Sequence, residues 1–357
     1  MGAGPHRMRA GLRFFCRRFA FFPRSFNEAL LCEETQAGMS EIVFATEGNP
    51  LPDRMVAGRL TMRDGKSIRY ARFAAGSRPL KGTVVIIPGR NESIEKYFET
   101  VRDLSARGLG SLVFDLRGQG GSDRLLRDPE RGHVASFDDY VADLEEVFDE
   151  VVLPDCRGPY YLLAHSTGAL VALLAAPTLI NRVRRMVLTS PLIAFARLPV
   201  SMKTLRRVTG LLYRLGLGSR YFGGGPRKSD PAPFSTNKLT TDHARYERNQ
   251  SIYREHPELG IGGPTAAWIH AACVASERLD DPDFIGRIHI PLLIIAAGAD
   301  EVVSTPATER LASRIRAGSI ITIDGARHEL LQEADLYREQ VLAAFDAFVP
   351  GTDLAVT

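Results

Sequence analysis

The chain has 357 residues, of which 45% are hydrophobic and 24% charged, a composition that supports a large buried core and excludes a disordered or fibrous protein. The formal net charge of +3 comes from residues 1–24, which carry six arginines and no acidic residue, so the rest of the chain is net negative. A main body with this charge argues against nucleic acid as a partner. No apolar run reaches the roughly 18 residues that a membrane span needs. The four cysteines are widely spaced and form no C-x-x-C pair, which predicts reduced thiols rather than a disulfide framework or a zinc site.

Residues 1–38 form an N-terminal basic extension that we expect to lie outside the fold. The arginines and phenylalanines between residues 13 and 22 could lie on a membrane as a basic amphipathic segment. The alternative is a non-structural extension, because Met39 begins a segment that already reads as a complete protein start. The apolar stretch at 19–22 is too short for a signal-peptide core, and Arg17-Arg18 is only a weak twin-arginine signal. We therefore expect a cytoplasmic protein, with peripheral contact at the inner membrane surface as the further alternative.

From residue 60 onward, strand and helix patterns alternate. Residues 60–74 read as a hairpin around Asp64-Gly65. The apolar runs at 83–87 and 111–115 are typical of strands buried on both faces, with a helical stretch between them. A second helix opens at Ser136, with Asp139 as its expected capping-box partner.

The second half of the chain repeats this alternation after one interruption. Strands are expected at 160–165 and 185–189, and then at 291–296 and 319–323, with helices at 305–317 and 334–348. Between residues 190 and 287 the alternation stops and gives way to an amphipathic piece at 202–217 and a glycine-rich break at 223–226. Repeated strand–helix units predict an α/β fold, a mostly parallel sheet with helices on both faces. The chain then divides into the extension 1–38, a core at 39–190 and 288–357, and an inserted helical lid at 191–287.

The most informative segment is residues 160–172, in which an apolar strand meets the turn Ala164-His165-Ser166-Thr167-Gly168 and a helix-forming run follows at once. This is the pattern of a nucleophile elbow, a strained turn that lifts one hydroxyl above the sheet. The flanking positions tolerate little more than Gly or Ala. Ser166 would stand at a helix N-terminus, where free N–H groups favour negative charge. Ser166 is therefore the candidate nucleophile, and His165 is expected to pack rather than react.

A serine hydroxyl needs a base, usually a histidine held by a carboxylate. In an elbow-bearing fold the partners follow in the order Ser, acid, His, each after a strand. Asp300 follows the strand at 291–296, and His328 follows the last strand. Glu301 is a rival for the acid. The alternatives are that Asp300 is a solvated loop carboxylate and that His328 is a loop histidine without a catalytic role.

Acyl transfer also needs an oxyanion hole of backbone N–H groups aimed at the developing charge. Thr167, directly after the nucleophile, should supply one N–H group. The loop after the strand at 83–87 should supply the other, and Arg90 is its natural candidate because Gly89 lets the backbone turn inward.

Taken together, these residues resemble the α/β-hydrolase family, in particular the branch of bacterial lysophospholipases and monoacylglycerol lipases. The resemblance covers roughly residues 58–349. It rests on the elbow and on five further motifs: Pro-Gly-Arg-x-Glu-Ser from residue 88, Asp-Leu-Arg-Gly-Gln-Gly-Gly-Ser from 115, Gly-His-Val-x-Ser-Phe-x-Asp-Tyr from 132, Gly-Ala-Asp from 298 and Ala-Arg-His-Glu-Leu-Leu from 326. Two positions depart from the family pattern: Ala164 replaces a glycine, and Pro88 replaces a histidine. The proline version resembles the lysophospholipase side of the branch.

The resemblance implies a serine hydrolase that cleaves the carboxylic ester of a monoacyl lipid, a lysophospholipid or monoacylglycerol, through an acyl-enzyme intermediate. It implies no metal or organic cofactor. The alternatives are an esterase or amidase acting on a small non-lipid substrate, and a non-catalytic binding protein with the same fold.

Specificity is expected to reside in the lid. The apolar side of its first helix, with Leu211 and Leu212, would hold the acyl chain, and its basic side would meet a phosphate or an anionic membrane surface. The alternative is that the apolar side packs on the core.

Overall fold

The computed structural model describes residues 1–2, 42–222 and 233–350. The chain divides into two compact units, Met1–Gly38 and Met39–Thr357, and the fold below is that of the second unit. The predictions made for residues 1–38 and for the glycine-rich break at 223–226 lie outside the described residues.

The centre of the unit is an eight-stranded sheet in the order β1-β2-β4-β3-β5-β6-β7-β8. The strands are β1 (Met55–Thr61), β2 (Ser67–Phe73), β3 (Gly82–Ile87), β4 (Leu109–Phe114), β5 (Tyr160–His165), β6 (Val183–Thr189), β7 (Leu292–Ala297) and β8 (Gly318–Ile323). β1 and β2 form the expected hairpin around Asp64-Gly65, and β2 pairs antiparallel with β4. All the remaining neighbours are parallel, so the prediction of a mostly parallel sheet is confirmed.

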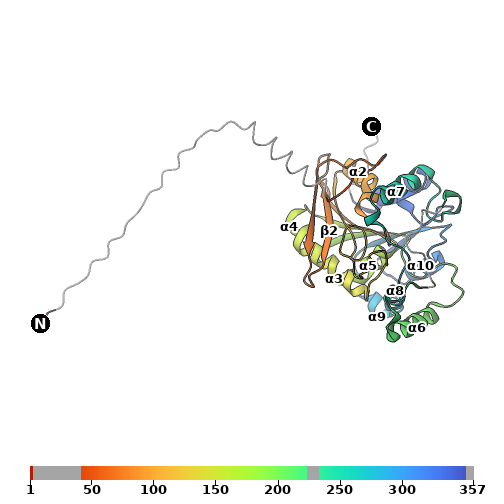
Figure 1. The fold of residues 1–357 in the computed structure, drawn as a ribbon. Coiled ribbons are helices and arrows are strands. Elements are labelled where there is room, and N and C mark those ends of the chain that lie inside the picture. The colour runs from red at the N-terminus through yellow and green to blue at the C-terminus, as the bar shows by residue number, and fades with distance from the viewer. Residues whose placement is uncertain (3–41, 223–232, 351–357) are drawn as a thin grey trace. The chain divides into compact units, whose positions relative to one another are not determined.

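Helices cover both faces of the sheet (Figure 1). The core elements outside the lid are η1 (Ile94–Tyr97), α2 (Phe98–Ala106), α3 (Phe137–Val147), η2 (Phe148–Val152), α4 (Leu153–Asp155), α5 (Thr167–Ala175), α10 (Thr305–Ala312), η7 (Leu330–Gln332) and α11 (Asp335–Phe348). One hydrophobic core includes Leu144 of α3, Leu170 of α5 and Leu311 of α10. The other includes Phe98 of α2 and Phe345 of α11. The continuous apolar strands β3 and β7 are fully buried because both of their faces are covered.

Two local predictions were wrong in detail. Ser136 does cap α3, but its hydroxyl accepts the N–H of Asp138 and donates to the carboxylate of the same residue, both at 3.1 Å. Asp139 contributes only its backbone N–H to this turn, because its side chain is a methylene shorter than the glutamate of a capping box. Helix α10 ends at Ala312 instead of residue 317, since the chain turns there to bring Gly318 into β8.

The interrupted stretch between β6 and β7 is helical, and α7 lies apart from α6, α8 and α9 (Figure 1). Its elements are α6 (Met202–Leu212), η3 (Tyr213–Leu217), η5 (Phe234–Thr236), α7 (His243–Glu255), η6 (Pro257–Leu259), α8 (Ala266–Arg278) and α9 (Pro282–Gly286). The amphipathic piece predicted at 202–217 is regular only as far as Leu212, and Gly216 breaks the following turn with φ 74°. Within the described ranges, no helix combines the length and the apolar character needed to cross a membrane.

Candidate active site

Ser166 forms the turn between β5 and α5, as the elbow pattern predicts. Its backbone has φ 50° and ψ −112°, a conformation that is strained for a residue with a side chain. A Cβ at Gly168 would lie 2.3 Å from the carbonyl oxygen of Ile87, so only glycine fits there. Ala164 is the last but one residue of β5 and is buried between two paired strands, where its methyl group is accommodated. The elbow therefore requires glycine after the nucleophile but not before it.

The structure brings the three predicted site residues together. His328 Nε2 lies 3.0 Å from Ser166 Oγ, and His328 Nδ1 lies 2.8 Å from Asp300 Oδ2. The other oxygen of Asp300 accepts the backbone N–H groups of Val302 and Val303 at 2.8 and 2.9 Å. Ser166 and His328 are buried, with 6% and 4% of their surface exposed. Their burial shields the hydrogen bonds between the three side chains from water.

Asp300 and its rival Glu301 have different surroundings. Burial acts to raise the pKa of Asp300, but the hydrogen bond and charge of His328, together with the two backbone N–H groups, outweigh it and hold the pKa below its usual value. Glu301 instead forms ion pairs with Arg197 at 2.9 Å and Lys238 at 3.5 Å. The geometry therefore selects Asp300 as the carboxylate that orients the histidine.

In the loop after β3, some backbone N–H groups already donate a hydrogen bond and others do not. The N–H of Gly89 is occupied, since it donates to Glu92 Oε2 at 2.5 Å. The N–H groups of Arg90 and Thr167 donate no hydrogen bond within the described residues, as an oxyanion hole requires. Gln119 holds the loop by donating to the carbonyl of Gly89 at 2.7 Å and accepting the N–H of Asn91 at 3.2 Å. The peptide groups on both sides of Arg90 are thus fixed by one amide side chain.

A buried charge cluster joins this loop to the histidine loop. Lys96 Nζ lies 2.6 Å from Glu92 and 2.6 Å from Glu329, the neighbour of His328. Burial alone would lower the pKa of Lys96, but the two carboxylates outweigh it and raise the pKa. Burial likewise acts to raise the pKa of Glu92, whereas the charges of Lys96 and His165 lower it to about 2. Glu92 and Glu329 lie in motifs that were recognised in the sequence. No pattern in the sequence predicted that Lys96 would form ion pairs with both of them.

His165 packs beside the site, as expected. Its Nδ1 lies 3.2 Å from both the carbonyl and the hydroxyl oxygen of Thr189, and its ring centre lies 4.8 Å from that of His328. Burial lowers the pKa of His165 to about 4, against the opposing charge of Glu92. His165 is therefore neutral at pH 7 and adds no positive charge beside the histidine base.

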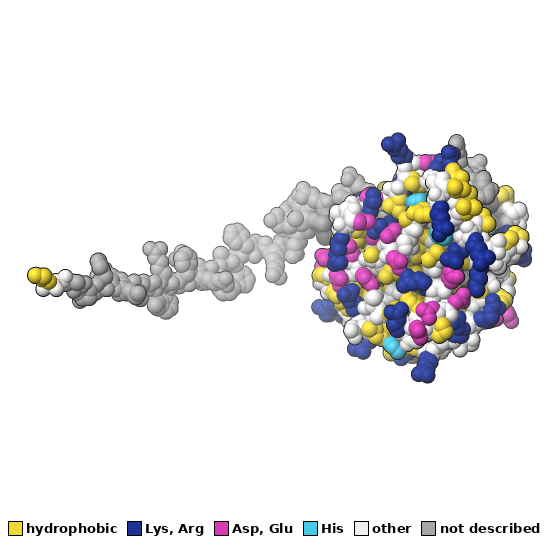
Figure 2. All heavy atoms as spheres, turned by 90° about the horizontal axis from the view of Figure 1, so that it is seen from below, with side chains coloured by type: hydrophobic (Ala, Val, Ile, Leu, Met, Phe, Trp, Pro, Cys, Tyr) yellow, Lys and Arg dark blue, Asp and Glu magenta, His cyan; other side chains and the backbone are white. Residues whose placement is uncertain are grey.

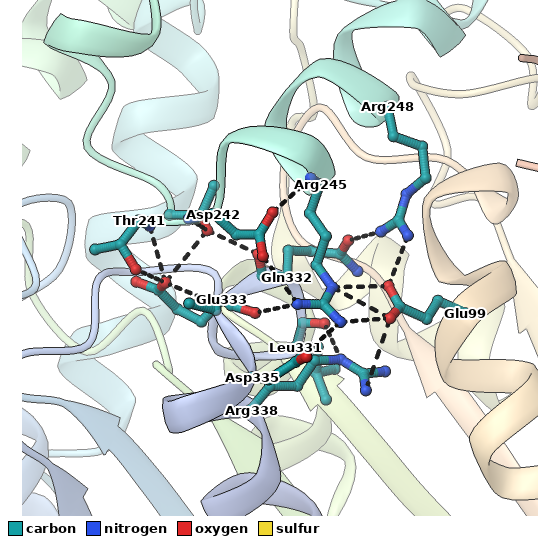
Figure 3. A network of polar contacts seen from close by, with 12 residues as sticks. Glu99, Thr241, Asp242, Arg245, Arg248, Leu331, Gln332, Glu333, Asp335 and Arg338 are labelled. Carbon is teal, nitrogen blue, oxygen red and sulfur yellow. Dashed lines mark hydrogen bonds and ion pairs between the residues drawn. The ribbon is translucent and has the colours of Figure 1, made fainter. Parts of the chain in front are cut away.

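A second polar network attaches α7 to the body of the molecule (Figure 3). Arg245 donates to Glu99 on α2 at 2.7 to 3.1 Å and to the carbonyl of Glu333 at 2.9 Å. The carboxylate of Glu333 accepts the N–H groups of Thr241 at 2.8 Å and Arg327 at 2.7 Å. Because Arg327 precedes His328, this part of the lid holds the histidine loop in place.

The two leucines predicted to bind substrate lie at the end of helix α6. The side chain of Leu211 is 58% exposed, and Leu212 is half-buried. Helix α6 packs on α8 and buries Leu205 and Thr209. The apolar surface of α6 is divided. The part with Leu205 packs inward, and the part with Leu211 faces outward. The contact of Leu211 and Leu212 with substrate stays a prediction.

A cavity of about 400 Å³ opens between α6, α8 and α10. Its apolar lining includes Ile193, Met202 and Leu311. Ile193 directly follows Leu192, whose N–H donates to the carbonyl oxygen of Ser166 at 3.0 Å. Neither Ser166 nor His328 is among the lining residues of the cavity, and charged side chains also line it: Lys203, Arg206, Glu277, Asp280, Arg310 and Arg314.

A parallel sheet with a serine elbow, followed in order by an acid and a histidine after later strands, defines the α/β-hydrolase class of proteins. A family model described as serine aminopeptidase, S33, matches residues 78–335, and the chain belongs to this family of hydrolases.

Individual relatives agree with this assignment. The chain is 33% identical over 296 residues to lysophospholipase L2 of Escherichia coli strain K12, covering 80% of this chain and 84% of that protein. It is 30% identical over 300 residues to a probable lysophospholipase L2 of Haemophilus influenzae, covering 84% and 92%. The solved structure of a soluble variant of monoglyceride lipase from Saccharomyces cerevisiae aligns with a TM-score of 0.66 at 19% identity, covering 86% of this chain and 97% of that one. The last match supports the fold alone.

Proposed function

We propose that this protein is a serine hydrolase that cleaves the carboxylic ester of a monoacyl lipid through an acyl-enzyme intermediate. The observation that carries the proposal is the hydrogen-bonded chain from Ser166 through His328 to Asp300, next to two backbone N–H groups with no partner in the described residues. This arrangement supplies a nucleophile, a base, an orienting carboxylate and an oxyanion hole.

The reaction proceeds in two halves. Ser166 Oγ attacks the ester carbonyl carbon while His328 Nε2 takes the hydroxyl proton, and the N–H groups of Arg90 and Thr167 stabilise the oxyanion. The intermediate collapses, the ester C–O bond breaks, and the leaving alcohol takes the proton from His328. A water molecule then attacks the acyl-enzyme with His328 again as base, releasing a fatty acid and free Ser166. Asp300 stays ionised and stabilises the imidazolium in both halves.

The choice of a monoacyl lipid as substrate is supported by the relatives. The proteins from Escherichia coli and Haemophilus influenzae are named lysophospholipase L2 and probable lysophospholipase L2, and both match most of the chain.

We further propose that the surface of α6 and η3 contacts a lipid surface. Exposed apolar side chains gather there with cations between them: Val200, Val208, Leu211, Tyr213, Leu215 and Leu217, with Lys203, Arg207 and Arg214. The underside of the molecule, where α6 lies in Figure 1, presents cationic side chains among hydrophobic ones (Figure 2). Such a surface suits the boundary between acyl chains and anionic head groups.

The first prediction tests the nucleophile. Ser166→Ala should abolish hydrolysis of a lysophospholipid and labelling by a fluorophosphonate probe, while the melting temperature stays close to that of the unaltered protein. Ser190→Ala is the matched control, because Ser190 is a buried neighbour whose hydroxyl has no hydrogen-bond partner in the described part of the chain. It should retain both activity and labelling.

Other outcomes of the same assay decide between the alternatives. Because the same catalytic groups cleave esters and amides, the substrate panel should include an aminoacyl anilide and an acetate ester. Higher kcat/KM on either of these than on a monoacyl lipid would overturn the lipid assignment. Full activity of Ser166→Ala would overturn the serine mechanism itself.

A further inference from the structure

The guanidinium group of Arg90 is enclosed but has no anionic partner. Its Nη2 donates to the carbonyl of Gly262, and its Cζ lies 5.5 Å from the centre of the Trp268 ring. A Cβ at Gly132 would lie 2.5 Å from Nη2, so glycine at that position makes room for the group. Its Nε is buried without a hydrogen-bond partner, and no carboxylate of the described residues forms an ion pair with it.

Other buried arginines in the described part of the chain can be compared with Arg90 by their ion-pair partners. Arg69, Arg107, Arg117 and Arg338 are all buried, and each contacts a carboxylate within ion-pair distance. An enclosed cation without such a partner is costly, because the carbonyl of Gly262 and the ring of Trp268 carry no opposite charge and replace its lost hydration only in part. Burial lowers the pKa of Arg90 to about 10, so the group still carries its charge at pH 7. This uncompensated charge is accounted for if an anionic ligand completes the site.

We infer that the Arg90 guanidinium binds the phosphodiester of a lysophospholipid substrate while the backbone N–H of the same residue binds the ester carbonyl oxygen. The inference rests on the proposed function. It assigns the head group, which the triad alone leaves open between phosphate and glycerol.

The covalent geometry of both partners suits this arrangement. Six bonds join the backbone nitrogen of an arginine to its Cζ, and six bonds join the ester carbonyl carbon of a lysophospholipid to its phosphorus. Two extended arms of this kind each span roughly 7 Å and can lie side by side. One residue can therefore contact both ends of the glycerol unit.

The chemistry of the free donors favours phosphate over a hydroxyl group. Nη1 makes no hydrogen bond within the described residues and is not among the enclosed atoms, so it can be reached from outside. Nε is enclosed and Nη2 is occupied by the carbonyl of Gly262, so Nη1 is the donor of the guanidinium fork that can reach a phosphate oxygen, and such a charged hydrogen bond is strong. The glycerol of a monoacylglycerol is neutral and would leave the charge of Arg90 uncompensated.

The test compares two substrates that share an acyl chain, oleoyl lysophosphatidylcholine and monooleoylglycerol. Arg90→Met should lower the ratio of kcat/KM for the lysophospholipid to that for the monoacylglycerol by about 10- to 100-fold, the selective loss expected for charged hydrogen bonds. Glycerol 3-phosphate should compete with the lysophospholipid in the unaltered enzyme and lose this effect in the variant.

Three further variants distinguish binding of phosphate by Arg90 from a structural role of the residue. Gly132→Ala retains the charge but displaces the guanidinium, and it should reproduce the selective loss. Arg131→Met is the matched control, because Arg131 lies next to Gly132 but is paired with Asp128 at 2.9 Å. It should affect the two substrates equally. Arg90→Lys, which keeps the charge but not the fork, should recover only part of the selectivity.

Several results would overturn the inference. Equal losses on both substrates for Arg90→Met and Gly132→Ala would show that Arg90 only supports the loop. No loss on either substrate would exclude any role in binding. Inhibition by inorganic phosphate that depends on Arg90, without discrimination between the two substrates, would identify a site for a free anion instead. If the unaltered enzyme hydrolyses neither lipid but cleaves small esters, the proposed function is wrong. That result can be distinguished from the outcomes above, which concern Arg90 alone.

Discussion

The backbone of Ser166 shows how a single residue is held in a costly conformation. A positive φ at a residue with a side chain costs of order 1–3 kcal/mol, and it persists only where neighbouring groups impose it. Here the N–H of Ser166 donates to the carbonyl of Thr189 at 3.0 Å, and its own carbonyl accepts the N–H of Leu192 at 3.0 Å. Gly168 then lets the chain pass against β3. The strain is thus opposed by contacts with two different strands.

The second prediction concerns the acid. Asp300→Asn should lower kcat by about 10⁴ with little change in KM, because His328 loses the carboxylate that sets its tautomer and stabilises its charge. Glu301→Gln is the matched control, since it removes a neighbouring carboxylate that pairs only with surface cations. Steady-state kinetics on a lysophospholipid checks both variants. A large loss for Glu301→Gln with none for Asp300→Asn would contradict the assignment.

At the scale of elements, the helices between β6 and β7 fall into two groups with different attachments. Helix α7 is fastened to α2 and to the histidine loop by charged hydrogen bonds from Arg245 and Arg248 (Figure 3). Helix α6 contacts α8 through the close approach of Gly210 to His270 and through Arg206, whose side chain pairs with Glu277 at 3.1 Å, and it leaves much of its apolar surface exposed. The first group contacts the loop that carries His328, and the second presents an exposed surface.

The third prediction tests that surface. Replacing Leu211 and Leu215 together with aspartate should weaken binding to vesicles of an anionic phospholipid by at least about tenfold, because each exposed leucine would otherwise enter the acyl region. Hydrolysis of a soluble acetate ester should be unchanged. Leu336→Asp is the matched control, since this leucine is 71% exposed on α11 and lies outside the patch. Co-sedimentation with vesicles measures the effect, and unchanged binding of the double variant would refute the lipid contact.

At the scale of the whole molecule, the stability of the folded unit is tied to pH through its buried polar groups. His165 is neutral in the folded protein, with a pKa of about 4, whereas the unfolded chain binds a proton near pH 6.5. Below pH 6.5 the unfolded state therefore holds more protons than the folded state, and the free energy of unfolding falls as the pH drops toward 4. The pKa of about 2 for Glu92 adds a further loss below about pH 4.5.

The fourth prediction follows from this balance. The free energy of unfolding should decrease by up to about 3 kcal/mol between pH 6.5 and 4 because of His165 alone. In His165→Gln the decrease over that range should be smaller, whatever the effect of the substitution at neutral pH. Urea denaturation at a series of pH values measures both curves. Parallel curves for the two proteins would show that His165 is not the group responsible.

The sequence predicted the order of the strands along the chain because apolar runs and their spacing are local properties. The runs at 83–87 and 291–296 lie in buried strands, and the turns at Asp64-Gly65 and Ser166 depend on residues close together in the chain. Helix ends were less predictable. The last residue of α10 and the cap of α3 depend on contacts that local propensity does not encode.

By itself, the sequence determined the strand–helix alternation and the placing of Ser166, Asp300 and His328 after β5, β7 and β8, and a parallel sheet brings the carboxyl ends of its strands to one edge. Only the tertiary structure decided how side chains far apart in the chain are paired. In the structure, Asp300 rather than Glu301 contacts His328, and Lys96 bridges two carboxylates. The side chain of Leu211 is exposed. The tertiary structure also left the guanidinium of Arg90 enclosed without a carboxylate partner among the residues that the structure describes. These outcomes depend on packing between distant segments, such as Ser166 and His328 at 162 residues apart, because burial and charge compensation arise only once those segments are in contact.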